Sequence, residues 1–230
     1  MQNKNIICGI IALLPFQFEA DDAVWRSDAE IASVAIPYVT ANYERIVREQ
    51  EQRHGITFSS VPAYTFDAHP TTEANAYYDP QSGSITFYTA GAFGADSLAQ
   101  AMTLLRVTRR QFRGELEGTT RHELGHDYFF ERAQAFGMKE YWYDHSRDIN
   151  GNPTSSSVAK RKIVEGVAEY MSGRKREDLD YGYDLVAPLL SLNCKDGIDV
   201  IVQNPTREDE WRNLPAYTKR LLEHISNKNL

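Results

Sequence analysis

The chain has 230 residues, of which 42% are hydrophobic and 25% charged, a balance that excludes a disordered or fibrous protein. Its net charge of −7 disfavours nucleic-acid binding, because that function needs a basic face toward the phosphates. The two cysteines, Cys8 and Cys194, cannot form a disulfide framework or a Cys-x-x-Cys motif. A chain of this length is expected to form one domain, or two lobes sharing a cleft.

The first segment is typical of an export signal. Lys4 precedes an apolar run over residues 6–16, and acidic residues follow the run. This order matches a secretory signal peptide, and the run is too short to span a bilayer. We therefore predict a signal peptide at 1–20, a secreted or periplasmic protein and no stable membrane insertion. The alternative is a buried first strand of a cytoplasmic protein.

The next part of the chain predicts a helix and then short strands. Apolar residues recur at three- and four-residue steps over 28–53, a pattern that favours an amphipathic helix ended by Gly55. Aromatic and β-branched residues then gather in short runs separated by turn signals, with a hairpin loop at 79–83. The predicted strands are 56–58, 61–66, 74–78 and 84–89.

From Ala95 onward the pattern is helical. Helices are expected from Asp96 to about residue 112, with Gly114 and Gly118 loosening the junction to the next one. Further helices are predicted at 119–136, 158–174, 185–192 and 211–225, and the segment 137–157 lacks a helical period.

Strands followed by helices predict an α+β fold. We expect a single domain over 21–230 with an α/β lobe at 21–113, a mostly helical lobe at 114–230 and a cleft between them.

The segment His122–His126, HELGH, carries the clearest chemical information. Residues four apart on a helix share one face, so both histidines can reach one zinc ion at about 2.0–2.1 Å. Glu123 lies at the edge of that face, where it can take a proton from a water on the metal. A catalytic zinc usually has a third protein ligand. The metzincin extension is excluded, because Phe129 and Arg132 stand where it needs glycine and histidine.

A second acidic motif, EGVAEY at 165–170, follows on a predicted helix. Together the two motifs resemble the gluzincin zinc metallopeptidases, whose third ligand is a glutamate that opens such a helix. The resemblance implies a zincin-like fold that holds one Zn²⁺ per chain through His122, His126 and Glu165. It also implies Glu123 as the general base and Glu169, one turn beyond Glu165, as an acid that hydrogen-bonds a ligand histidine.

The resemblance further implies hydrolysis of peptide bonds in a peptide or protein substrate, by an endopeptidase rather than an exopeptidase. Gluzincins commonly use a tyrosine or histidine to hold the oxyanion, and the segment 181–190 looks like the tyrosine-bearing helix of related families. Tyr183 and then Tyr181 are the candidates. Extended peptides usually pair with a strand edge. We expect that edge strand to consist of Ser84, Ile85, Thr86, Phe87 and Tyr88.

Other functions stay open on the sequence alone. A non-catalytic zincin-like module would bind zinc or a partner, although the intact Glu123 weighs against it. A zinc amidohydrolase acting on a non-peptide substrate would carry the same motifs, because no specificity pocket is visible in the sequence. A calcium loop within 144–157 has some of the required acidic spacing, but Ile149 stands where an EF-hand loop opened by Asp144 needs glycine. The oligomeric state is left open.

Overall fold

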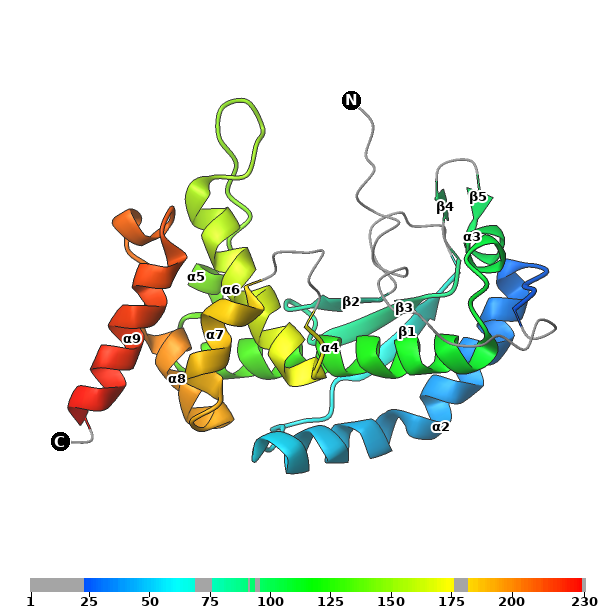
Figure 1. Cartoon of the computed structure of the whole chain (residues 1–230), viewed down its shortest axis with the longest axis horizontal. Helices are drawn as coiled ribbons and strands as arrows, with labels where there is room; N and C mark the ends of the chain where they lie inside the picture. The colour runs from blue at the N-terminus through cyan, green and yellow to red at the C-terminus, as the bar shows by residue number, and fades with distance from the viewer. Residues whose placement is uncertain (1–22, 69–75, 91, 94–95, 176–181, 229–230) are drawn as a thin grey trace. The chain divides into compact units, whose positions relative to one another are not determined.

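The computed structural model describes residues 23–68, 76–90, 92–93, 96–175 and 182–228. The described residues form an α+β fold, mostly helical with a small three-stranded sheet (Figure 1), which confirms the expected class. They divide into two compact units. The first contains the described residues through Ile46 and Pro62–Glu123, and the second contains Val47–Val61 and the residues from Leu124 onward. The predicted signal peptide at 1–20 lies outside the described residues.

The first unit contains all the strands of the described residues. The three-stranded sheet consists of β1 (Ala63–Asp67), β2 (Ala76–Asp79) and β3 (Ser84–Tyr88), and β4 (Ala92–Phe93) pairs with β5 (Asp96–Ser97). Three helices contribute residues to this unit: α2 (Asp28–His54), α3 (Leu98–Leu104) and α4 (Arg109–Ala135). The predicted helix at 28–53 and the hairpin loop at 79–83 are confirmed.

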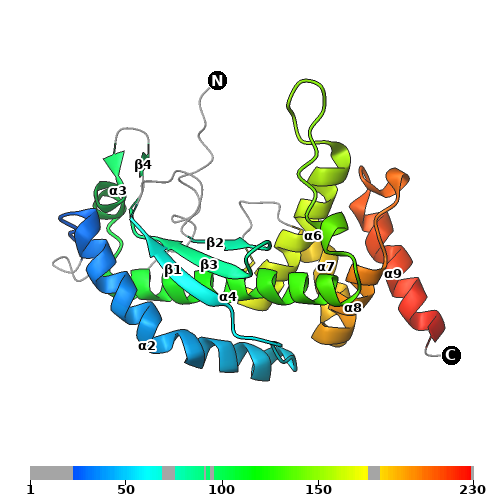
Figure 2. The ribbon, with the colours of Figure 1, turned by 180° about the vertical axis from the view of Figure 1, so that it is seen from behind.

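The strand order is β1-β3-β2, with β3 parallel to β1 and antiparallel to β2. The ribbon shows β3 between its two neighbours (Figure 2). The expectation that Ser84, Ile85, Thr86, Phe87 and Tyr88 form an edge strand is therefore wrong. Both sides of β3 already carry a hydrogen-bonded partner strand, so this strand offers no edge to an extended peptide.

One face of this sheet is apolar. Ile85 and Phe87 of β3 are 0% and 1% exposed, and they pair in register with Tyr64 and Phe66 of β1. Tyr43 of α2 packs on this face, with its ring centroid 4.4 Å from that of Tyr64. Alternation of buried and exposed residues fixes the register, since a slip by one residue would turn the apolar side chains to solvent.

The break between α3 and α4 falls at residues 105–108, not at the two glycines. Ser97 and Gln100 form a capping box that begins α3, and Arg106 takes a left-handed conformation (φ 52°) at its end. Thr108 and Gln111 then exchange side-chain to backbone hydrogen bonds of 2.8 and 3.2 Å, which begins α4. A glycine costs a helix only about 1 kcal/mol, so packing carries α4 through Gly114 and Gly118.

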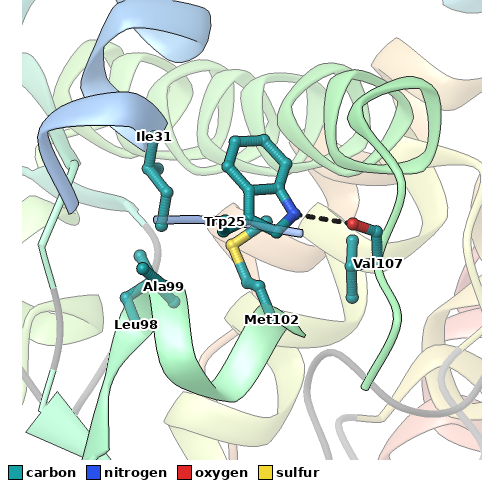
Figure 3. Close-up of a cluster of buried hydrophobic side chains, with 6 residues drawn as sticks. All are labelled: Trp25, Ile31, Leu98, Ala99, Met102 and Val107. Atoms are coloured by element: carbon teal, nitrogen blue, oxygen red, sulfur yellow. Dashed lines mark hydrogen bonds between the residues drawn. The ribbon is translucent and has the colours of Figure 1, made fainter. Parts of the chain in front are cut away.

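A buried cluster around Trp25 holds this break in place (Figure 3). The indole Nε1–H of Trp25 donates to the carbonyl oxygen of Val107 at 2.7 Å, and Phe112 packs edge-on against the same ring. Ile31 and Met102 are 0% and 1% exposed in the cluster. A segment far upstream thus closes the turn that precedes α4.

The second unit is helical in its described residues. Besides the C-terminal parts of α2 and α4 it contains α5 (Lys139–Trp142), α6 (Ser155–Ser172), α7 (Tyr183–Leu190), α8 (Cys194–Gln203), the 3-10 helix η2 (Glu208–Glu210) and α9 (Leu214–Lys228). The helices predicted at 158–174, 185–192 and 211–225 correspond to α6, α7 and α9. The predicted strand at 56–58 is wrong: Ile56 and Phe58 donate their backbone N–H groups to Glu51 near the end of α2.

Partly buried ion pairs link the helices of the second unit. Arg132 of α4 donates twice to Asp199 of α8, at 2.6 and 2.9 Å. Arg220 of α9 donates in the same two-pronged way to Glu210, at 2.6 and 2.9 Å. Two-pronged arginine–carboxylate pairs fix orientation as well as distance.

Within the part of the chain that the structure describes, no helix has the length and apolar character needed to cross a membrane.

The segment between α5 and α6 is fixed to α6 by a buried lysine. Lys160 is 7% exposed, and its Nζ lies 2.7 Å from Asp144 Oδ2 and 3.9 Å from the ring centroid of Tyr141. Burial alone would raise the pKa of the Asp144 carboxyl, but hydrogen bonds from Lys160 and Ser146 lower it to about 2. Asp144, the first acid of the calcium loop considered from the sequence, is therefore paired with the ammonium group of Lys160.

This ion pair predicts a specific dependence of stability on pH. The pKa of Asp144 is about 2 in the folded protein and about 3.9 in an unfolded chain. Its stabilising contribution is therefore complete above about pH 5 and is lost as the pH falls toward 2. In urea titrations, the wild type should exceed Asp144→Asn in free energy of unfolding near pH 6, and this excess should shrink by on the order of 1 kcal/mol by pH 2.5.

Asp209→Asn, at an exposed acid of η2, is the matched control for the loss of one carboxylate. Parallel pH curves for the wild type and Asp144→Asn would contradict the ion pair.

Candidate metal centre

The structure brings the three predicted metal ligands together. His122 and His126 lie one turn apart on α4, and Glu165 lies on α6. One ligand atom from each residue lies within 4.8 Å of the other two. Two histidines at this spacing share one face of a helix, so α4 supplies two ligands and α6 supplies the third.

One donor–donor distance and the chemistry of the three donors are compatible with zinc. The Nε2 atom of His126 lies 3.5 Å from Oε2 of Glu165. Two atoms bound at 2.0–2.2 Å to one tetrahedral ion lie about 3.4 Å apart. Imidazole nitrogens suit zinc, whereas magnesium and calcium prefer all-oxygen sites. The His126 and Glu165 side chains are 12% and 20% exposed, which shields the site but leaves it in contact with solvent.

Glycine on α4 lets α6 approach closely enough for this convergence. A Cβ atom on Gly125 would lie 2.8 Å from Cα of Ala168 and 3.3 Å from Cβ of Met171. The first distance is shorter than real carbon–carbon contacts, so the α4 backbone packs directly against α6. Gly125 directly precedes His126, and Ala168 lies one turn after Glu165. The contact therefore holds the two ligand-bearing turns side by side.

Local contacts define both ends of α6, the helix that carries Glu165. Thr154 caps the first turn by accepting the backbone N–H of Ser157 at 3.2 Å. Gly173 ends the helix in a left-handed conformation with φ of 74°. At the start of α7, Gly182 lies so close to the carbonyl oxygen of Lys162 that a Cβ there would be 2.3 Å away. Thr154 and Gly173 therefore define where α6 begins and ends, and Gly182 packs directly against its backbone at Lys162.

Glu123 is held by the sheet. Its Oε2 accepts the backbone N–H of Tyr78 in β2 at 2.8 Å, and the residue is 6% exposed. The sequence places Glu123 beside His122 on the helix face, but it offers no hint of this partner, because the donor is a backbone amide. Only the tertiary arrangement reveals the contact.

The other predicted site residues have different outcomes. Glu169 lies one turn beyond Glu165 and is 2% exposed, and its hydrogen bond to a ligand histidine stays a prediction. Tyr183 begins α7, and its ring packs 5.9 Å from that of Tyr170. Its role as oxyanion donor also stays a prediction, and Tyr181 lies outside the described residues. Arg161 approaches Glu165 at 3.9 Å, but it is 78% exposed, so water screens this pair.

Comparison of the chain with protein-family models, with curated proteins and with solved structures finds no match. The resemblance to gluzincins therefore rests on the HELGH and EGVAEY segments, and the function has to be argued from the site itself.

The contact at Gly125 predicts a coupled loss of stability and metal affinity. In Gly125→Ala the new methyl group meets the Ala168 backbone, which cannot move away without shifting α6. Zinc affinity, measured by chelator competition, should fall at least about 10-fold, as is typical when groups that orient metal ligands are disturbed. The midpoint of thermal unfolding should fall as well.

The matched control is Gly114→Ala on the same helix, where a Cβ would meet nothing within 4 Å. This change should stabilise the protein by roughly 0.5–1 kcal/mol and leave zinc affinity unchanged. Equal zinc affinity in the two variants would show that the close approach does not shape the metal centre.

Proposed function

We propose that the chain is a zinc-dependent peptidase of the gluzincin type with a zincin-like fold. In this proposal His122, His126 and Glu165 hold one Zn²⁺, and Glu123 is the general base. The observation that carries the proposal is the meeting of the three ligand atoms within 4.8 Å of one another, beside an acid already fixed in place. Export of the protein belongs to the same proposal and rests on the sequence of residues 1–20.

The residues divide the chemical work between them. Bound zinc would polarise the scissile carbonyl and lower the pKa of a bound water from 15.7 to about 7. Glu123 accepts one proton of the attacking water at a carboxylate oxygen, while the water oxygen bonds to the carbonyl carbon. When the C–N bond breaks, Glu123 returns that proton to the leaving nitrogen. A tyrosine hydroxyl, from Tyr183 or Tyr181, would donate a hydrogen bond to the developing oxyanion.

A peptide substrate would pair with the outer strand β2 and not with the central strand β3. Among the described strands, β1 and β2 form the outer positions of the sheet. The backbone of β2 contacts the proposed general base through Tyr78. A substrate that extends the sheet beside β2 would therefore bring a peptide group toward Glu123.

The test combines metal content with hydrolysis. Glu123→Gln should retain one zinc per chain, because no proposed ligand changes. Its cleavage rate should fall by roughly 10²–10⁴-fold, because an amide cannot accept the proton. Glu165→Ala should lose both zinc and activity, and Glu140→Ala, at an exposed acid of α5, should lose neither. Zinc is measured by metal analysis, and cleavage by mass spectrometry of peptide libraries and denatured protein.

The outcomes separate the proposed function from its alternatives. One zinc without cleavage of any peptide would favour a non-catalytic zinc-binding module. Zinc with hydrolysis confined to non-peptide amides would favour an amidohydrolase. Full activity in Glu123→Gln would refute the assigned base, and intact zinc content in Glu165→Ala would refute the third ligand.

A further inference from the structure

We propose that the backbone N–H of Tyr78, on the outer side of β2, is a positioning group for the general base. It holds one carboxylate oxygen of Glu123 and leaves the other directed to the attacking water. This inference rests on the proposed function, because it assigns a role in the same reaction. The observation that carries it is the 2.8 Å hydrogen bond from Tyr78 N to Glu123 Oε2.

The pairing of β2 with β3 shows why this N–H is available. In an antiparallel pair, residues alternate between positions that bond to the neighbouring strand and positions that face away from it. Tyr78 lies opposite Ile85 of β3, yet its N–H donates to Glu123. The backbone N–H of Tyr78 therefore faces away from β3. Its hydrogen bond to Glu123 does not replace a hydrogen bond between β2 and β3.

The donor is held rigidly. The Tyr78 side chain is 6% exposed, which fixes the rotation of the strand at this residue. The hairpin that follows is closed by Asp79, whose carboxylate accepts the backbone N–H groups of Gln81 and Ser82 at 3.0 and 3.3 Å. A donor fixed by a strand and a tight turn imposes a direction on the carboxylate that a mobile side chain would not.

The acceptor needs such a constraint. Glutamate has several rotatable bonds, and its carboxylate must lie within hydrogen-bond reach of the proton that it takes. A charge-assisted hydrogen bond is stronger than a neutral one, and Glu123 is buried at 6% exposure. Misplacing a reacting group by about 1 Å can cost about 10²-fold in rate. Fixing Oε2 therefore selects the carboxylate orientation that serves catalysis.

The experiment compares Tyr78→Pro with Tyr78→Ala. Both variants lose the buried ring, but only proline removes the N–H. Proline is tolerated on an outer strand where the N–H faces away from the sheet, so the pairing with β3 should survive. Both variants should bind one zinc. The kcat of Tyr78→Pro should lie about 10- to 100-fold below that of Tyr78→Ala, because only proline removes the donor that holds Glu123.

A second measurement does not depend on activity or on the folding of the proline variant. Hydrogen exchange of the Tyr78 amide, followed by NMR, should be slow in the wild type and in Glu123→Gln, whose side-chain carbonyl still accepts the bond. Exchange should be faster in Glu123→Ala, while the amides of β3 stay protected.

Equal kcat in the two Tyr78 variants would overturn the positioning role. Unchanged exchange of the Tyr78 amide in Glu123→Ala would overturn the hydrogen bond itself. If the wild type cleaves no peptide, the proposed function fails and the positioning role fails with it, whereas the exchange measurement still decides whether Tyr78 and Glu123 are bonded.

Discussion

The direct contact between α4 and α6 is the constraint on which the metal centre depends. Histidine and glutamate side chains are short, so ligands from two helices meet at one ion only when the backbones lie close together. Gly125 and Ala168 remove the side-chain bulk that would separate the helices. The residues that flank this contact, His126 and Glu165, then approach to 3.5 Å. The small residues at the crossing therefore allow the close approach that the proposed metal site needs.

The two neighbouring residues His122 and Glu123 have different partners. His122 belongs to the ligand cluster with Glu165 of α6, whereas Glu123 is fixed by the backbone of β2 through Tyr78. A helix can serve both partners because successive residues point about 100° apart. The proposed ligand His122 and the proposed general base Glu123 therefore contact different parts of the fold.

Buried polar groups anchor the segments around the centre. Lys160, one turn and one residue before Glu165, pairs with Asp144 and so ties the preceding loop to α6. Such a pair is costly to bury unless its partners are well placed. Here the ring of Tyr141 lies beside the ammonium group and the backbone N–H of Ser146 donates to the carboxylate. The same helix therefore carries the proposed metal ligand Glu165 and the lysine that binds the segment leading into the helix.

Features that depend on neighbouring residues could be predicted from the amino-acid sequence. The histidine spacing at 122–126, the helix at 28–54 and the hairpin loop at 79–83 follow from local periodicity and turn chemistry. The expectation that Glu165 is the third ligand came from the resemblance of EGVAEY to the gluzincin glutamate motif and not from a local pattern.

Contacts between distant segments could not be predicted in this way. β3 is the central strand because β1 and β2 pair with its two edges. Local sequence patterns do not indicate the order of strands in a sheet. The break before α4 is stabilised by the hydrogen bond from Trp25, a residue far upstream. The prediction relied on Gly114 and Gly118 and therefore placed the break too late in the chain. Glu123 is held by the backbone N–H of Tyr78. Every residue type except proline has such a group, so the identity of residue 78 gives no sign of this contact. Contacts between remote segments are set by packing, which local patterns do not encode.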